Sequence, residues 1–345
     1  MMKLKLFQNW LKQEGIGIAV LTHSDYHFTY FTRIKPSMGC AFITPTKATI
    51  LISSLDPKPV LKGIVVEKLE KNWDKKQYNM RIKKVGINKS SITVKFFEQL
   101  KKIYPTARFV DISEGLAKLR MVKTNTELMR LTKACRITDN TFKAVVKNIK
   151  HLKTEQGLAD FIQRKIEEQG AELSFPTIVA SGRNSAIPHH QTSQGKLIKG
   201  FLMIDFGAKF EGYCADMTRM LYLGRPSRKE RELYALLLKV QQQAINQVKL
   251  NLLYSQLDKS VRTALGKYSS QFIHSLGHGV GLETHESPRI GPESKDKVLK
   301  NSVFTIEPGI YFPGQFGIRI EDTVLFDGKV KVLTRSSKKL GIINI

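Results

Sequence analysis

Residues 201–216, which read FLMIDFGAKFEGYCAD, decide the fold of the larger part of this 345-residue chain. The first six residues form an apolar run that carries a single acid, Asp205, as expected for a buried strand. After the turn region Ala208 to Gly212, a returning strand would bring Asp216 beside Asp205 on one face of a hairpin. Two like charges placed so close in an apolar setting require a cation. The stretch therefore predicts an antiparallel hairpin that holds a cation.

The same arrangement recurs further along the chain. The apolar stretch FTIEPG (304–309) delivers Glu307 ahead of a Pro-Gly turn region, and GIRIED (317–322) delivers Glu321. Arg319 lies two residues before Glu321, hence on the same face of its strand, where a guanidinium can orient a carboxylate through a bidentate contact. We therefore expect two hairpins that direct four acids inward.

The segment HSLGHGVGLETH (274–285) adds three imidazoles, His274, His278 and His285. Its glycines leave the backbone room to approach ions or substrate closely. A neutral imidazole binds a metal ion, whereas other histidines donate to a developing oxyanion or shuttle protons. Four carboxylates with one imidazole suit a pair of divalent ions, manganese, cobalt or zinc, better than one structural zinc. Two ions held by shared carboxylates are typical of a hydrolase.

Length and composition set the class of protein. The chain is long enough for two domains, and its hydrophobic content of 41% with 25% charged residues is ordinary for a globular protein. Residues 1–13 mix lysines with apolar residues and do not resemble a secretory signal, and no run approaches the roughly 18 apolar residues of a membrane span. We expect a cytoplasmic protein with no membrane partner. Cys40, Cys135 and Cys214 lack C-x-x-C spacing and are expected to be reduced and buried.

The formal net charge of +26 is the unusual feature of the composition. Such a charge raises nucleic acid or an anionic membrane as a partner. The lysines are spread along the whole chain, however, and are not gathered into one tract with interleaved aromatic residues. We therefore expect a solvated basic surface and no nucleic-acid partner.

Periodicity divides the chain into two domains. Residues 1–118 predict a small α/β domain in which His23, Asp25 and His27 form a loop-like surface cluster. Residues 119–345 predict long amphipathic helices over an antiparallel sheet, an α+β arrangement. Capping boxes at 124–127 and 227–230 open helices that run to about residues 150 and 250. Further expected elements are strands at 16–21, 39–44, 48–53, 83–87 and 108–110, and helices at 90–104, 154–169 and 255–267.

The motifs resemble, in content and in order, those of the pita-bread metallopeptidases, which include methionine aminopeptidase, aminopeptidase P and prolidase. The resemblance covers roughly residues 124–326 and implies a pita-bread catalytic domain. The leading domain resembles that of aminopeptidase P and prolidase, and methionine aminopeptidase lacks one. The matching segments are SFPTIVASG (174–182), IPH (187–189), DFGA (205–208), GYCADMTR (212–219), HSLGHGVGLETHE (274–286), EPGIY (307–311) and GIRIED (317–322).

The resemblance also implies the metal ligands. Asp205 would chelate one ion, Asp216 and Glu321 would bridge both, and His278 and Glu307 would complete the other. Two divalent ions are expected, with Mn²⁺ as the first choice and Co²⁺ or Zn²⁺ as alternatives. Members with this leading domain are commonly dimers, so a homodimer is expected.

Substrate-side residues follow from the same resemblance. His189, His274 and His285 match the substrate-side histidines of the family, and Arg319 is counted with the catalytic residues. Glu307 would handle the proton of the attacking hydroxide, and His285 would stabilise the tetrahedral oxyanion. Arg289 resembles the position at which some prolidases hold the carboxylate of a dipeptide.

The sequence thus predicts a dinuclear Xaa-Pro peptidase acting on proline-containing peptides. Aminopeptidase P, which accepts longer peptides, is placed slightly ahead of prolidase, because a dipeptidase needs a closed site that no motif here guarantees. Creatinase shares the fold but not this ligand set. A more remote alternative is an inactive peptidase-like module that binds nucleic acid or a partner, and the intact set of ligands argues against it.

Overall fold

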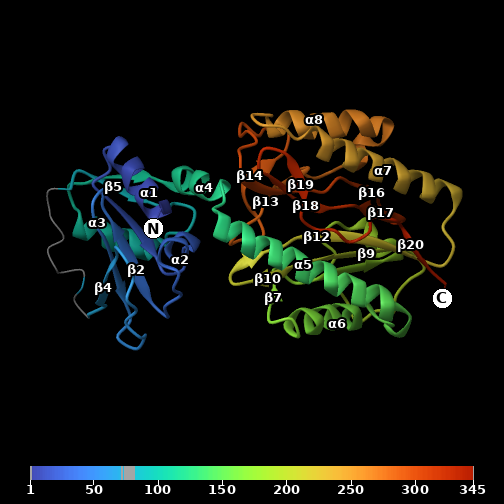
Figure 1. The fold of residues 1–345 in the computed structure, drawn as a ribbon, viewed down its shortest axis with the longest axis horizontal. Coiled ribbons are helices and arrows are strands. Elements are labelled where there is room, and N and C mark those ends of the chain that lie inside the picture. Colours follow the sequence, from blue (N-terminus) through green and yellow to red (C-terminus); the bar gives the residue numbers. More distant parts are fainter. Residues whose placement is uncertain (1, 71–72, 74–81, 345) are drawn as a thin grey trace. The chain divides into compact units, whose positions relative to one another are not determined.

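The computed structural model describes residues 2–70, 73 and 82–344, and the chain divides into two compact units, Met1–Arg120 and Met121–Ile345 (Figure 1). Each unit builds its own sheets and its own hydrophobic core. Over the described ranges, no helix combines the length and apolarity needed to cross a bilayer. All three cysteines are free and buried, as predicted.

The N-terminal unit is built on a six-stranded mixed sheet with the order β4-β3-β2-β1-β5-β6. Strands β1, β2 and β3 pair antiparallel, and the other neighbours pair parallel. Every strand predicted in this region is present, and the predicted helix is shorter at its start than expected. The elements are α1 (Met2–Gln13), β1 (Ile18–Thr22), α2 (Tyr26–Thr32), β2 (Gly39–Ile43), β3 (Ala48–Ile52), β4 (Val65–Lys68), β5 (Lys84–Ile87), α3 (Val94–Ile103), β6 (Arg108–Asp111) and α4 (Ser113–Met121).

The expectation of a surface cluster at His23, Asp25 and His27 is wrong for two of the three residues. Asp25 is 2% exposed and His27 is 8% exposed. The Asp25 carboxylate caps α2 by accepting from the backbone N–H of His27 at 2.8 Å, and it also accepts from Asn88 Nδ2 at 2.7 Å. Asp25 is therefore an internal helix cap, and the apolar residues of α2 carry His27 inward with it.

The C-terminal unit combines four α-helices of its own with several short sheets. Its strands pair antiparallel except for β12 and β20, which are parallel. The main sheets have the orders β20-β12-β9-β8 and β14-β13-β15-β18-β19. The elements are α5 (Asn125–Asn148), α6 (Glu155–Glu167), β7 (Glu172–Leu173), β8 (Ile178–Ser181), β9 (Gly200–Phe206), β10 (Ala208–Phe210), β11 (Tyr213–Cys214), β12 (Met217–Leu223), α7 (Arg228–Gln247), α8 (Tyr254–Leu265), β13 (Gly277–Gly279), β14 (Glu286–Ile290), β15 (Ser302–Ile306), β16 (Gly309–Phe312), β17 (Phe316–Arg319), β18 (Asp322–Phe326), β19 (Val330–Val332) and β20 (Gly341–Ile343), with 3-10 turns at Ile149–His151, Gly182–Ala186 and Gly266–Gln271.

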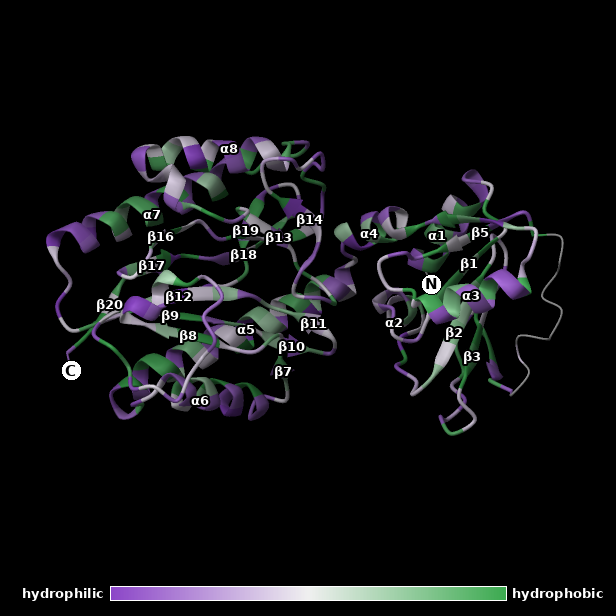
Figure 2. Cartoon of the chain, turned by 180° about the vertical axis from the view of Figure 1, so that it is seen from behind, coloured by the Kyte–Doolittle hydropathy of each residue, from purple (hydrophilic) through white to green (hydrophobic). Residues whose placement is uncertain are grey.

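The helices of this unit cover the sheets from two sides. Figure 1 shows α7 and α8 on one side of the strands and α5 and α6 on the other. Both predicted capping boxes form, at Thr124 for α5 and at Ser227 for α7. In Figure 2, α6 and α8 carry both hydrophilic and hydrophobic residues, as expected for helices that bury one face. Two cores result, one beneath each helical layer.

The strands that carry the acids form extended hairpins. In the pairing of β9 with β12, Asp205 lies opposite Thr218, so Asp216 sits just beyond the end of the ladder. The second pair differs from the prediction, because Pro308-Gly309 is not a turn. Strand β16 instead starts at Gly309 and pairs with β17, and the tight turn between them lies near Gly314. This inner hairpin lies between β15 and β18 in the chain, and those two strands pair with each other.

Three glycines mark places where two backbones touch near these strand ends. A Cβ atom on Gly207 would lie 1.8 Å from the carbonyl oxygen of Ala215, and one on Gly277 would lie 2.2 Å from that of Thr305. Gly279 meets the carbonyl oxygen of Ser287 in the same way, at 2.2 Å. Because these clashes are with backbone, no side chain fits at these positions without moving a strand.

Candidate metal centre

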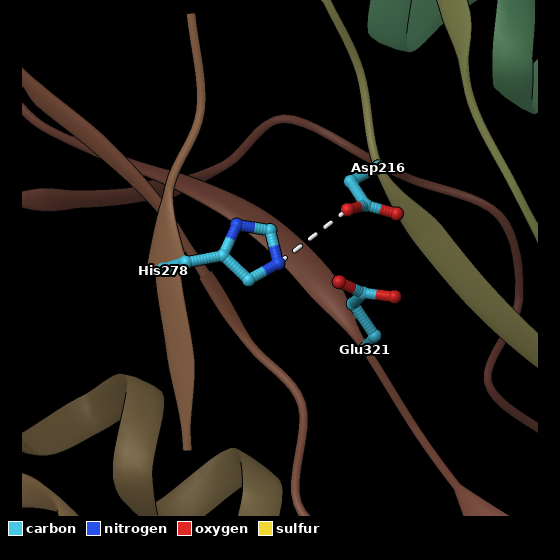
Figure 3. A group of neighbouring side chains, drawn as sticks. All are labelled: Asp216, His278 and Glu321. Carbon is cyan, nitrogen blue, oxygen red and sulfur yellow. Dashed lines mark ion pairs between the residues drawn. The ribbon is translucent and has the colours of Figure 1, made fainter. Parts of the chain in front are cut away.

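Three side chains from distant parts of the sequence converge at the strand ends. Asp216 directly precedes β12, Glu321 directly precedes β18, and His278 lies in β13. One ligand atom of each lies within 4.8 Å of the other two, and Figure 3 shows the two carboxylates and the imidazole pointing toward one another. Such a group of oxygen and nitrogen ligands is suited to a divalent cation.

Glu307 and Asp205 lie beside this group. The Nε2 atom of His278 is 3.2 Å from Glu307 Oε1 and 3.6 Å from Asp216 Oδ2. Asp205 joins through Arg319, whose Nη2 atom donates to Asp205 Oδ2 at 2.6 Å. The structure therefore brings together all five residues that the sequence predicts as ligands, although it does not test their individual roles.

The site fits a cation on two grounds. Asp205 Oδ1 is buried and, among the described residues, has no hydrogen-bond partner, so a strong acceptor is left over. The carboxylates also resist ionising together: burial and the charge of Glu321 raise the pKa of Asp216 well above its ordinary value, and burial and the charge of Glu307 do the same for Glu321. A divalent ion would relieve both conditions.

His278 is oriented as a ligand. Its Nδ1 atom lies 3.2 Å from the carbonyl oxygen of Gly279, which can only accept, so Nδ1 carries the proton and Nε2 faces the carboxylates. Burial alone would lower the pKa of His278, but without a metal ion the contact with Glu307 raises it, so Nε2 also carries a proton and donates to Glu307. Burial alone would raise the pKa of Glu307, but this hydrogen bond outweighs it and brings that pKa to about 2. Glu307 is therefore the acid that stays ionised most readily in the group.

Arg319 contacts the acids, but not through the predicted bidentate contact, because a single bond from Nη2 reaches Asp205. Besides Asp205, it donates from Nε to Thr218 Oγ1 at 3.0 Å, and Thr218 Oγ1 donates to Glu321 Oε2 at 2.7 Å. Its Nη1 atom donates to Tyr311 OH at 3.0 Å. One buried guanidinium thus fixes two carboxylates from different hairpins, directly in one case and through a hydroxyl in the other.

Sequence reasoning assigned no role to Thr218 or Tyr311. Tyr311 lies inside the EPGIY motif, and Thr218 follows Asp216 by two residues on the same strand face, so spacing alone could have drawn attention to both. Spacing could not predict the hydrogen-bond partner of either hydroxyl, because those partners lie on other strands.

The predicted substrate-side histidines take different environments. His274 has both ring nitrogens engaged, Nδ1 at 2.8 Å from the carbonyl oxygen of Ser275 and Nε2 at 3.0 Å from Tyr311 OH. The ring of His285 lies 4.1 Å from that of His278. Burial lowers the pKa of both His274 and His285, which favours neutral imidazoles at physiological pH. His189 is exposed and near enough to influence both electrostatically.

Arg289 lies on β14 directly opposite His278 in the register with β13. Its Nε atom donates to Ser275 Oγ at 2.8 Å. In the described part of the chain, the two terminal nitrogens of this exposed guanidinium make no hydrogen bond. Arg289 therefore has free donors on the strand next to His278.

Comparisons with known proteins agree with this geometry. Residues 129–327 match the family model described as Metallopeptidase family M24, and residues 3–122 match the Creatinase/Prolidase N-terminal domain. The chain is 34% identical to the Xaa-Pro dipeptidase of Pyrococcus horikoshii, with 98% of each protein covered.

Two solved structures show the same architecture. The Xaa-Pro dipeptidase from Bacillus anthracis superimposes with a TM-score of 0.91 at 30% identity, covering 99% of each chain. The X-Pro aminopeptidase from Thermotoga maritima gives a TM-score of 0.84 at 28% identity, covering 95% of this chain and 98% of that one. The predicted combination of a small α/β domain with a pita-bread catalytic domain is confirmed. The chain belongs to metallopeptidase family M24 and carries a creatinase/prolidase N-terminal domain.

Proposed function

We propose that this chain is a metal-dependent Xaa-Pro dipeptidase, which hydrolyses the bond between an N-terminal residue and a following proline. The observation that carries the proposal is the convergence of Asp205, Asp216, His278, Glu307 and Glu321 at one buried point. Relatives that match nearly the whole chain bear the name Xaa-Pro dipeptidase. The sequence alone placed aminopeptidase P slightly ahead of prolidase, and the comparisons favour prolidase.

In this proposal the five residues hold two divalent ions, with Mn²⁺ first and Co²⁺ or Zn²⁺ as alternatives. Asp216 and Glu321 are the shared ligands, Asp205 serves one ion, and His278 and Glu307 serve the other. Bound divalent ions supply a water of lowered pKa and polarise the scissile carbonyl group.

The chain's own residues would then bind substrate and move protons. Glu307, whose Oε1 atom lies 3.2 Å from Nε2 of His278, would accept a proton from the attacking water at its carboxylate. Partial desolvation lowers the pKa of the exposed His285, and its neutral ring can donate an N–H to the carbonyl oxygen as negative charge develops there. His274 is held by Tyr311 and Ser275, so its contribution is to fix Tyr311 beside Arg319.

Proline supplies the scissile nitrogen, and this explains why a dedicated site is needed. The Xaa-Pro bond is a tertiary amide without an N–H, so an enzyme that binds that donor fails on it. Recognition must instead come from the charged ends of the peptide. For a dipeptide the carboxylate end is one residue from the cleaved bond, and Arg289 has free donors near His278 that can receive it.

Substituting Met for Arg289 is expected to raise KM for Ala-Pro by about 10- to 100-fold, the loss of a charge-assisted hydrogen bond. The amide Ala-Pro-NH₂ has no carboxylate and should be cleaved equally by both proteins. Steady-state kinetics with the two substrates measures the difference. Arg228→Gln, which removes an exposed arginine paired with Glu232 on α7, is the control and should match the wild type. An equal loss on both substrates would contradict carboxylate binding by Arg289.

The proposal is tested by hydrolysis of Ala-Pro and Ala-Pro-Ala after incubation with Mn²⁺, Co²⁺ or Zn²⁺. A dipeptidase cleaves Ala-Pro alone. Cleavage of Ala-Pro-Ala at a comparable rate would instead favour aminopeptidase P, a candidate supported by the likeness to the X-Pro aminopeptidase structure. Inactivity on both substrates with every metal would overturn the assignment.

Removal of divalent ions by a chelator is expected to lower the melting temperature by about 5–10 °C, since an ion present at 100 times its Kd contributes about 2.7 kcal/mol. Differential scanning calorimetry with and without chelator measures the shift. Asp216→Asn serves as the control, because a protein that has lost the site should show no shift. An unchanged melting temperature in the wild type would contradict a shared site.

Two further expectations belong to the proposal. A homodimer is predicted, and sedimentation would detect it. Tight binding of nonspecific DNA is not expected despite the charge of +26. A complex that persists at physiological salt would favour the alternative of a binding module.

A further inference from the structure

The Glu155 carboxylate is a hydrogen-bonding hub outside the metal centre. Glu155 is completely buried, and its Oε1 accepts from Ser181 N, Ser181 Oγ and Asn184 Nδ2, each at 2.9 Å. Its Oε2 accepts from His190 Nε2 at 2.8 Å and from Ser193 Oγ at 3.0 Å. Burial alone would raise the pKa of Glu155, but hydrogen bonds led by those of Asn184 and His190 hold it below its ordinary value. An ionised acceptor is thus matched to five donors.

All five donors belong to one segment, residues 181–193, which also contacts Arg319 through the carbonyl oxygen of Pro188. The backbone reinforces the attachment: the N–H of Glu155 donates to the carbonyl of Gly195, and that of Gln156 donates to the carbonyl of Ser193. Glu155 is also the first residue of α6, so the helix fixes the direction of its side chain. The segment is therefore fastened to the start of α6.

His189 lies within this segment and depends on its neighbours for its position. In the described residues, His189 makes no hydrogen bond of its own, and its side chain is exposed. The residue before it, Pro188, has its carbonyl bound by Arg319 Nη1 at 3.1 Å. The residue after it, His190, is bound by Glu155. His189 is thus held from one side by the organiser of the metal centre and from the other by Glu155.

We propose that Glu155, acting through His190, is a positioning residue that holds His189 beside the candidate metal centre, where Arg319 binds the carbonyl oxygen of the preceding Pro188. This inference rests on the proposed peptidase function and on the resemblance that places His189 on the substrate side. Glutamine has nearly the same shape as glutamate, but one carboxylate oxygen is replaced by an NH₂ group. That NH₂ group cannot accept hydrogen bonds and would face the donors of the segment. The segment would then lose its hold on the residue after His189.

The test is a double-mutant cycle between Glu155→Gln and His189→Ala on the metal-loaded protein with Ala-Pro. Glu155→Gln alone is expected to lower kcat/KM about 10- to 100-fold, the effect of misplacing a contacting group by about 1 Å. In the His189→Ala background the same change should cost less than about 3-fold, because the group it positions is already gone. Equal losses in both backgrounds, or no loss in the first, would overturn the inference.

A matched control separates positioning from general stabilisation. Asp25→Asn removes another buried carboxylate with several donors, in the N-terminal unit, and should lower the melting temperature while leaving kcat/KM unchanged. His190→Leu removes a single donor and is the second variant should Glu155→Gln not fold. It is expected to lower kcat/KM in the same way, and an unchanged value would count against the inference.

Hydrogen exchange followed by mass spectrometry gives a readout that does not depend on turnover. In Glu155→Gln, amides of residues 181–198 should exchange faster, while those of β13 and bound metal content stay as in the wild type. If the wild type fails to cleave Xaa-Pro peptides yet exchange responds in this way, the proposed function fails and the fastening role of Glu155 stands. Unchanged exchange in residues 181–198 would overturn that role.

Discussion

Substituting Asn for Asp216 is expected to abolish metal binding and turnover together, with kcat/KM falling on the order of 10³-fold or more. Asp216 supplies an oxygen that lies within reach of both His278 and Glu321, so its loss removes a central ligand. Atomic spectroscopy of the dialysed protein and steady-state kinetics with Ala-Pro measure the two effects. Unchanged turnover would eliminate Asp216 as a shared ligand.

The same substitution should act in the opposite direction on the metal-free protein. Burial and the neighbouring acids make ionisation of Asp216 unfavourable, so a neutral amide relieves repulsion that the free acid must bear. Without metal we therefore expect Asp216→Asn to melt at or above the temperature of the wild type. With metal the order should reverse. A variant that is less stable under both conditions would indicate a purely structural role.

Substituting Met for Arg319 is expected to destabilise the protein by about 3–5 kcal/mol, because Asp205 would remain buried without its partner. The loss should be greater in the absence of metal, since a bound cation would compensate Asp205. Activity should also fall, on the order of 10²-fold, because Asp205 loses the contact that orients it. Urea unfolding with and without Mn²⁺, together with kinetics, measures both effects.

Arg319→Lys is the matched control for this prediction. An ammonium retains the positive charge but cannot donate in the geometry that joins Asp205, Thr218 and Tyr311. We expect it to restore most of the stability and little of the activity. If Arg319→Lys recovered stability and activity equally, then Arg319 would contribute only its positive charge, and the arrangement of its guanidinium N–H donors would not matter.

The elements of the fold were predictable where local chemistry determines them. The capping boxes at Thr124 and Ser227 marked two helix starts correctly, because the reciprocal hydrogen bonds lie within four residues. The apolar run around Asp205 marked β9 in the same way. The convergence of four acids and one imidazole was predicted from motif order and resemblance.

Long-range register was not predictable. Pro308-Gly309 has the composition of a turn, yet it continues into β16, because pairing with β17 outweighs local preference. Asp25 and His27 were predicted to be surface residues, but the fold buries them, and Asn88 and Ser91 donate to Asp25 from more than 60 residues away. The hub at Glu155 gave no signal either, because its donors lie 26 to 38 residues away and only the tertiary structure gathers them.

The order in which the ligands occur along the chain has a consequence for biosynthesis. Asp205 and Asp216 leave the ribosome about a hundred residues before Glu307 and Glu321, and β18 must pair before Glu321 reaches its place. A nascent chain would therefore complete the proposed ligand set only when the last hairpin has formed, and we expect metal loading to follow that step. The bound cation should then depend on which metal ions are available to the completed chain. Expression in media supplemented with different metals is therefore expected to yield protein that contains different metals.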